Sequence, residues 1–229
     1  MSLIQEILRN GEMKLWHDYS SGSLADLSGN GNDGAFVNSP FINRNGVSTN
    51  GTDNYIQVGD DDSLSFGDGS VDSPFSLVVW VHEIPSQTYL IHKTEDSTSA
   101  ANLEYIFRTD ATGRLAFFTY DASASAQIGQ YASVGSEIEV GKSYILIGTY
   151  DGSSTSAGMK IYANGVLVPS ALNEAGVYVA MENLAKNVGI GRRGSSYSKA
   201  VYEQVMIMGR ELDATEAAKL TGELLNKKY

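Results

Sequence analysis

Short runs of β-branched, aromatic and aliphatic residues recur along the chain, and each run is closed by Gly, Asn, Asp or Ser. Runs of this length with turn residues between them are typical of β-strands. No segment with a helical period lies between them, which favours antiparallel sheets over a parallel sheet with crossover helices. The pattern predicts strands at Lys14–His17, Gly34–Val37, Tyr55–Val58, Phe75–His82, Thr88–Lys93, Glu104–Thr109, Arg114–Tyr120, Lys142–Tyr150, Met159–Ala163, Asn187–Gly191 and Glu203–Met208.

Some of these segments carry more specific information. The pair Asn164-Gly165 directly follows the run Met159–Ala163. It predicts a tight hairpin, because both central residues of a type I′ turn need a positive φ. Arg114–Tyr120 and Lys142–Tyr150 are more continuously apolar. We expect them to be central strands that are covered on both faces.

Helical periodicity is confined to the two ends of the chain. Near the C-terminus, Asp213 and Glu216 form a capping pair that opens a helix over Ala214–Leu225. Its apolar face predicts that this helix lies against the sheets. At the N-terminus, Ser2 caps a short helix that ends before Gly11.

The N-terminal helix has an apolar stripe that must be buried somewhere: Leu3, Ile4, Ile7 and Leu8. We interpret residues 1–12 as an arm and residues 13–229 as one domain. An isolated helix this short is marginal in water, so it should become ordered on a surface. Two surfaces are candidates: the stripe folds back on its own domain, or it docks on a partner protein.

Composition narrows the classes of function. The chain has 229 residues, no cysteine and a net charge of −11. This length suits one β-sandwich domain, and the absence of cysteine excludes disulfides, thiolate zinc sites and a cysteine nucleophile. The negative charge disfavours phosphate backbones, so we expect no nucleic-acid partner. No apolar run approaches the roughly 20 residues of a membrane span, so we expect no membrane partner.

An ordered series of motifs resembles a known family: Asp26–Gly34, Asn50–Val58, Phe75–Trp80, Gly148–Gly152 with Ile161–Gly165, Val188–Gly191 and Arg210–Asp213. Over about residues 13–225 the chain resembles the concanavalin A-like, laminin-G family. The resemblance implies an all-β fold, a two-sheet antiparallel jelly-roll β-sandwich, here with a short N-terminal helix and a C-terminal helix. We expect Trp80 to fill the core between the two sheets.

The same family includes glycoside hydrolases, so we asked whether any pair of carboxylates has the spacing of a glycosidase motif. The segment Glu211–Glu216 has the letter spacing of such an enzyme motif, but it straddles the entry to the C-terminal helix and fits the capping pair. The three histidines, His17, His82 and His92, are not spaced as metal pairs, and no nucleophile-elbow sequence occurs. We therefore predict no catalytic residues and a protein that is not an enzyme.

Calcium is the inorganic ion that the sequence favours. Asp26, Ser28 and Asn30 imitate the first half of an EF-hand loop, but the second half lacks its bidentate carboxylate. The family resemblance implies a structural calcium that bridges this loop to the last strand, with Asp26 and Glu203 as ligands. Relatives often carry adjacent acids there, whereas this chain has Glu203-Gln204. The alternative is that Asp26 only makes Asx turns.

Aromatic residues in loops are candidates for contact with a sugar, because an aromatic face stacks on a sugar ring while the hydroxyl stays hydrated. Tyr131, Tyr178 and Tyr197 lie in predicted loops. The alternative is that each of them covers an edge of the sandwich.

The family suggests an extracellular recognition module, but the N-terminal residues lack the features of a secretory signal peptide. A protein of the virion surface resolves this conflict. We expect a phage capsid decoration or fibre-associated subunit, a homo-oligomer that contacts capsid or tail subunits, a glycan, or both. The main alternative is a carbohydrate-binding or adhesion module of a bacterial cell surface, and a glycoside hydrolase is a distant one.

Overall fold

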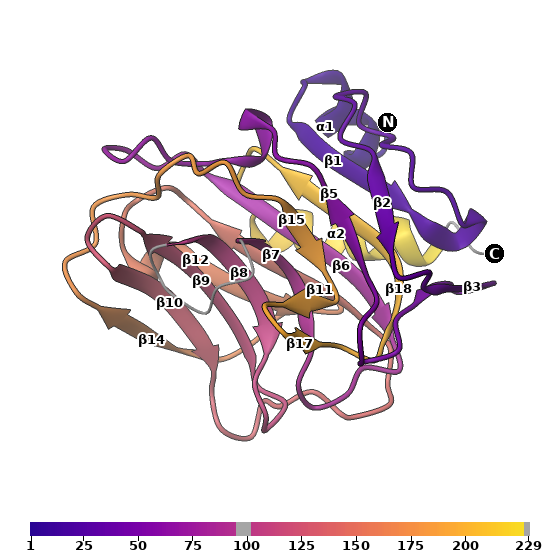
Figure 1. The fold of residues 1–229 in the computed structure, drawn as a ribbon. Coiled ribbons are helices and arrows are strands. Elements are labelled where there is room, and N and C mark those ends of the chain that lie inside the picture. The colour runs from indigo at the N-terminus through magenta and orange to yellow at the C-terminus, as the bar shows by residue number, and fades with distance from the viewer. Residues whose placement is uncertain (95–101, 227–229) are drawn as a thin grey trace.

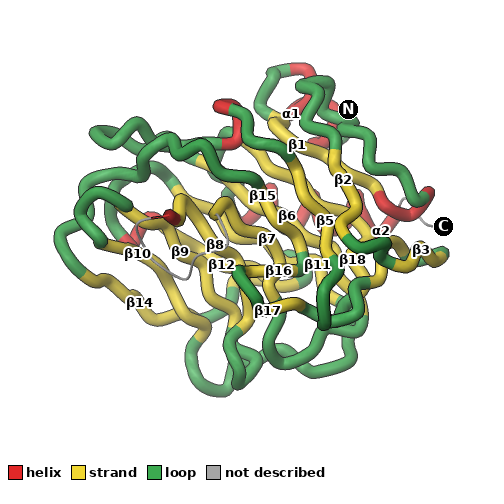
Figure 2. Tube along the Cα trace, in the orientation of Figure 1, coloured by secondary structure: helices red, strands yellow, loops and turns green. Residues whose placement is uncertain are grey.

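The computed structural model describes residues 1–94 and 102–226 and shows two packed antiparallel sheets with a helix at each end of the chain (Figure 1). Strands form the two layers, and loops join them around the rim (Figure 2). Among the described residues, short 3-10 turns lie in loops at η1 (Tyr19–Ser21), η2 (Asp62–Leu64) and η4 (Ser156–Gly158). This is the predicted two-sheet sandwich with its two helices. Among the described residues, no helix is long and apolar enough to cross a membrane.

The first sheet runs in the order β13-β12-β11-β6-β18-β4-β3. Strand β1 also belongs to it: β4 pairs with the start of β18, and β1 pairs with the rest of β18 along the same edge. Its strands are β1 (Met13–Asp18), β3 (Phe41–Asn43), β4 (Gly46–Ser48), β6 (Phe75–His82), β11 (Tyr144–Tyr150), β12 (Met159–Ala163), β13 (Val166–Leu167) and β18 (Val201–Met208). The predicted hairpin between β12 and β13 is confirmed: Asn164 has a φ of 51° and Gly165 a φ of 78°.

The second sheet runs in the order β14-β10-β9-β8-β7-β15-β5-β2. Its strands are β2 (Gly34–Val37), β5 (Tyr55–Val58), β7 (Tyr89–Thr94), β8 (Leu103–Thr109), β9 (Leu115–Asp121), β10 (Ala126–Ala132), β14 (Ser170–Ala175) and β15 (Val188–Ile190). A small hairpin of β16 (Arg192–Arg193) and β17 (Ser196–Tyr197) follows β15. As expected, the central strands β9 and β11 are buried almost throughout.

The main core lies between the two sheets. Its aromatic centre is the stacked pair Phe66 and Phe75, whose ring centroids are 4.5 Å apart, with Tyr105 and Phe117 packed around it. Burying one such side chain contributes about 1.5–3 kcal/mol, so this core dominates the stability of the sandwich. It also fixes which side chains of each strand face outward, because neighbours along a strand point to opposite faces.

A second core lies on the outer face of the first sheet, under both helices. Helix α1 (Leu3–Arg9) and helix α2 (Ala214–Asn226) pack there. The predicted cap and the predicted capping pair are both present: Ser2 Oγ accepts from Gln5 N, and Asp213 and Glu216 bond each other's backbone N–H groups. Trp80 belongs to this second core. The expectation that Trp80 lies between the sheets is therefore wrong.

The N-terminal stripe is buried in this second core. Leu3, Ile4 and Ile7 are at most 3% exposed, and Leu8 is half-buried beside them. The Glu223 carboxylate of α2 accepts hydrogen bonds from the backbone N–H groups of Leu3 (2.6 Å) and Ile4 (3.2 Å). The prediction that these residues dock on a partner is therefore wrong. They fold back on their own domain, which was the alternative that the sequence left open.

Candidate ligand-binding site

A hollow of about 180 Å³ opens on the outer face of the second sheet, where β5, β15 and β7 lie side by side. Ile56 and Val58 of β5 and Val188 of β15 belong to the inter-sheet core. Since side chains alternate along a strand, their neighbours point outward into the hollow. The lining residues are Tyr55, Gln57, His92, Thr94, Asn187, Val188, Gly189, Arg192 and Gly194.

His92 is the buried polar side chain of this hollow. It is only 4% exposed, yet neither ring nitrogen has a hydrogen-bond partner. Burial lowers its pKa to about 3, although the nearby backbone of Arg192 favours the charged form. The imidazole is therefore neutral at physiological pH, with one donor nitrogen and one acceptor nitrogen. Buried polar groups without partners are rare in proteins, so this pair of nitrogens needs an explanation.

One wall of the hollow is held rigidly by Arg192. Its guanidinium lies 4.6 Å from the centre of the Tyr55 ring, and its Nη1 donates to the Tyr55 hydroxyl at 2.8 Å. Its Nε donates to the carbonyl of Gly194 at 2.7 Å, and Tyr55 in turn donates to Gln57. The wall thus presents one aromatic ring in a fixed orientation.

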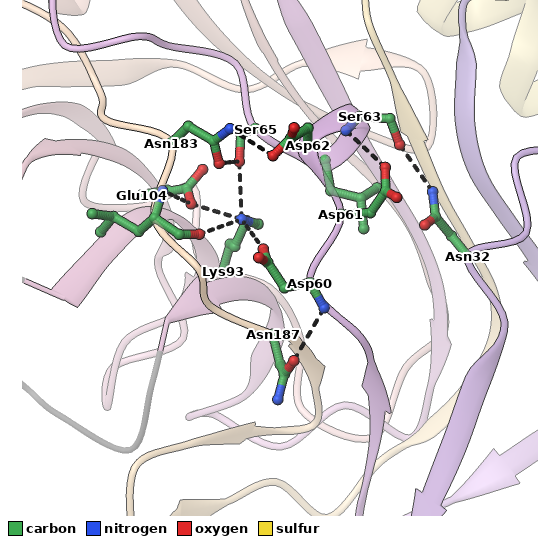
Figure 3. A network of polar contacts seen from close by, with 12 residues as sticks. Asn32, Asp60, Asp61, Asp62, Ser63, Ser65, Lys93, Glu104, Asn183 and Asn187 are labelled. Atoms are coloured by element: carbon green, nitrogen blue, oxygen red, sulfur yellow. Dashed lines mark hydrogen bonds and ion pairs between the residues drawn. The ribbon is translucent and has the colours of Figure 1, made fainter.

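The floor of the hollow is tied to a buried polar network (Figure 3). Asn187 accepts a hydrogen bond from the backbone N–H of Asp60 at 3.1 Å, and the Asp60 carboxylate pairs with Lys93 at 2.7 Å. Lys93 is fully buried and also bonds Glu104 at 2.7 Å, Ser65 and the carbonyl of Leu184. Lys93 follows His92 on β7, so the network holds the strand that presents the imidazole.

Two of the three predicted tyrosines lie on this face of the molecule. Tyr197 packs beside the hollow, with its ring 5.8 Å from the Arg192 guanidinium. Tyr131 lies farther along the face, against Phe118 and beneath Arg114. Both were expected to lie in loops, and this expectation is wrong: Tyr197 belongs to β17 and Tyr131 to β10.

Tyr178 is in a loop, as predicted, but it points elsewhere. It packs against the inter-sheet core, and its hydroxyl donates to Asp72 at 2.7 Å. Asp72 also accepts from the Tyr150 hydroxyl and from the backbone N–H of Met181. Tyr178 therefore closes an edge of the sandwich, which was the alternative for this residue.

Both predicted calcium ligands, Asp26 and Glu203, make hydrogen bonds within the protein. The two carboxylate oxygens of Asp26 accept hydrogen bonds from Trp16 N, Asn32 N, and both N and Oγ of Ser28, which is an Asx-type turn. Burial raises the pKa of Asp26, but these hydrogen bonds lower it by more. The pKa of Asp26 is therefore below its usual value. Glu203 is engaged by His82 instead. In the part of the chain that is described, no three acids or histidines gather as metal ligands.

The other two histidines are both hydrogen-bonded. His17 lies in the core, with its ring nitrogens 2.9 Å from the Tyr19 hydroxyl and from the carbonyl of Asn32. His82 lies on the opposite sheet from the hollow, between Ser143 and Glu203. Sequence reasoning missed the distinct role of His92, because no motif marks a histidine whose nitrogens lack partners.

Comparison with solved structures shows the same fold in several other proteins. Domain 4 of an arabinanase from Geobacillus stearothermophilus, solved in complex with arabinotriose, aligns with a TM-score of 0.64 and 14% identity over 92% of this chain and 98% of that one. A botulinum neurotoxin type C structure, from work on its interaction with two ganglioside molecules, aligns with a TM-score of 0.68 and 15% identity over 96% of this chain. The binding domain of Paraclostridial Mosquitocidal Protein 1 aligns with a TM-score of 0.66 and 15% identity over 96% of this chain.

This chain spans about half the length of the two toxin structures, 53% of each. A search of curated protein sequences found no match. The profile of the concanavalin A-like lectin/glucanases superfamily, in its laminin-G form, matches residues 50–218, which is most of the chain. The chain belongs to the concanavalin A-like lectin/glucanase superfamily.

Proposed function

We propose that this protein is a carbohydrate-binding module that takes one sugar ring in the hollow on the outer face of the second sheet. The observation that carries the proposal is His92, whose two ring nitrogens are buried in the hollow without partners. A sugar hydroxyl both donates and accepts hydrogen bonds, so adjacent hydroxyls suit the donor and the acceptor of a neutral imidazole. Both nitrogens are buried, so the ring must turn toward the hollow for a sugar to reach them, and the hydrogen bonds gained would then remove the cost of leaving them unsatisfied.

The other lining residues support a sugar. The Tyr55 side chain lines the hollow, and Gln57 and Asn187 supply side-chain amides. The hollow is smaller than the roughly 300–1,000 Å³ that encloses a drug-sized ligand, so it suits a single ring. The structural neighbours named for arabinotriose and gangliosides add support for a glycan, at the level of the shared fold.

A panel of immobilised oligosaccharides tests the proposal, with arabinotriose and ganglioside oligosaccharides among the probes. Wild-type protein should bind a subset of the panel, and His92→Phe should lose that binding while it keeps an aromatic ring against Gly189. Asn173→Ala, on β14 outside the hollow, serves as the matched control and should bind as wild type. A panel with no hits, or hits that survive His92→Phe, would reject this site.

Placement on a virion surface remains a proposal from the sequence. Neighbouring head or tail genes would support it. A neighbouring secretion operon would favour the bacterial adhesion alternative. Both placements are compatible with the same glycan-binding hollow, so the two questions are tested separately.

A further inference from the structure

Three polar side chains form a hydrogen-bonded row on the first sheet: His82 ends β6, Glu203 lies in β18, and Ser143 directly precedes β11. Ser143 Oγ lies 2.7 Å from His82 Nδ1, and His82 Nε2 lies 2.6 Å from Glu203 Oε2. The residues are 61 and 121 positions apart in sequence, and the pairing of β6 with β11 and β18 brings them together. This row is separate from the hollow on the second sheet.

Burial is graded along the row. The Glu203 side chain is fully buried, that of His82 is 17% exposed, and Ser143 is exposed to solvent. Glu203 sits where the register of β18 against β6 shifts, between Tyr202 and Gln204. The irregular strand therefore places an acid behind the histidine and leaves the serine at the surface.

This arrangement fixes the tautomer of His82. A carboxylate only accepts hydrogen bonds, so the Nε2 that faces Glu203 carries the proton. The Nδ1 lone pair then faces Ser143 and accepts its hydroxyl proton. A nucleophile, a base and a group that orients the base are in hydrogen-bond contact, which is the arrangement of an activated serine.

A second hollow, of about 200 Å³, adjoins this row. Val201 lines it and pairs with His82 across β6 and β18, Glu83 follows His82, and Gly141 precedes Ser143 by two residues. Most of its lining is apolar or glycine: Pro85, Val140, Gly141, Ala200 and Val201. Its size and lining suit a short acyl group.

We propose that Ser143, His82 and Glu203 form a nucleophilic site that hydrolyses esters of short acyl groups. The site goes beyond the binding function, and it would make the prediction of a non-enzymatic protein wrong. No nucleophile-elbow motif marks it, because its members lie far apart in the sequence and Ser143 is in the loop before β11.

The reaction needs only the ester and water. Ser143 Oγ attacks the carbonyl carbon while its proton passes to His82 Nδ1, and Glu203 stabilises the resulting imidazolium. The bond from that carbon to the alkoxy oxygen breaks, and His82 gives its proton to the leaving alcohol. Water then attacks the acyl-serine with His82 as base. The Ser143–acyl bond breaks, the serine recovers its proton, and the acid is released.

Two probes test the site on the full chain: a fluorophosphonate, which labels activated serines with loss of fluoride, and p-nitrophenyl acetate. Peptide mapping should place the phosphonyl group on Ser143, and Ser143→Ala should abolish the label. Ser153→Ala is the matched control, since this exposed serine contacts only Thr155 through its hydroxyl, and it should label as wild type. Release of p-nitrophenolate should fall about a hundredfold in Ser143→Ala and His82→Gln.

Glu203→Gln separates a nucleophilic role from a structural one. The amide can donate to Nε2, which moves the proton to Nδ1 and removes the base from Ser143. Labelling should be lost in a variant that keeps the wild-type circular dichroism spectrum. If Glu203→Gln does not fold, Ser143→Ala still tests the proposal, because Ser143 is exposed and its substitution should leave the fold intact. Labelling or hydrolysis that persists in folded Ser143→Ala would overturn the proposal.

Discussion

The imidazole of His92 occupies the space that a side chain on Gly189 would need. A Cβ placed on Gly189 would lie 2.6 Å from both Cε1 and Nε2 of His92, closer than real Cβ contacts come. The two residues pair across β7 and β15. Glycine on one strand thus allows the histidine on the next to lie flat over the sheet, at the wall of the hollow.

Gly189→Ala should therefore disturb the proposed sugar site directly. The added methyl group forces the ring to move, at a cost of about 1–3 kcal/mol in unfolding free energy. Glycan binding should fall along with stability, measured by urea denaturation and by the oligosaccharide panel. Gly59→Ala is the control, because nothing lies within 4 Å of its Cβ position. Wild-type binding by Gly189→Ala would show that the position of His92 does not matter.

The predicted tyrosines should separate by function. Tyr197→Ala removes a ring beside the hollow and should weaken glycan binding about fivefold, which corresponds to roughly 1 kcal/mol. Tyr178→Phe removes only the hydroxyl that donates to Asp72. It should lower the free energy of unfolding by about 1 kcal/mol and leave binding unchanged. Reversed effects in calorimetric titrations and melting curves would mean that the binding surface includes Tyr178 instead.

The N-terminal helix should matter for stability. Deletion of residues 2–9 uncovers the second core and removes three buried aliphatic side chains, so the melting temperature should fall by roughly 10 °C or more. Glu223→Gln weakens the carboxylate contact with the start of α1 and should cost about 0.3–1 kcal/mol. A truncated protein that melts like wild type would bring back the hypothesis of a docking arm.

Glu104 gives the stability of the protein a dependence on pH. Burial raises its pKa from 4.5 to about 7, although Lys93 pulls the value down. The folded chain keeps a proton on Glu104 at pH values where the unfolded chain has lost it. The contribution of this group to stability is therefore present below about pH 4.5 and is lost as the pH rises through about 7.

Other carboxylates titrate in the same range, so the test is a difference between variants. The free energy of unfolding of wild type minus that of Glu104→Gln should fall between about pH 5 and about pH 8. Urea denaturation at the two pH values measures it. A difference that rises with pH would mean that the ion pair with Lys93 outweighs the cost of burial.

Much of the fold could be predicted from the sequence, because apolar runs and turn residues mark strands that are buried. The strands that were missed lack this signal. β14 is exposed along almost its whole length, and β10 contains two glutamines and a glycine. Trp80 was placed in the wrong core because β6 is apolar on both faces. A strand with no alternation does not reveal which side chains face which layer.

The candidate sites were harder to predict for a related reason. Both depend on contacts between residues far apart in sequence: His92 with Gly189, and Ser143 with His82 and Glu203. None of these residues lies in a local motif. Of the three tyrosines predicted from the sequence, Tyr131 and Tyr197 lie on the face of the proposed site and Tyr178 does not.

The most direct test of the central claim is a titration of the histidine ring nitrogens by long-range proton–nitrogen NMR, with the tightest-binding oligosaccharide of the panel. The account predicts that both nitrogen signals of His92 shift with saturating behaviour, because hydroxyl groups of the sugar bond them. The signals of His17, whose nitrogens already have partners, should stay in place. Saturable binding that leaves the His92 signals unmoved would contradict the account.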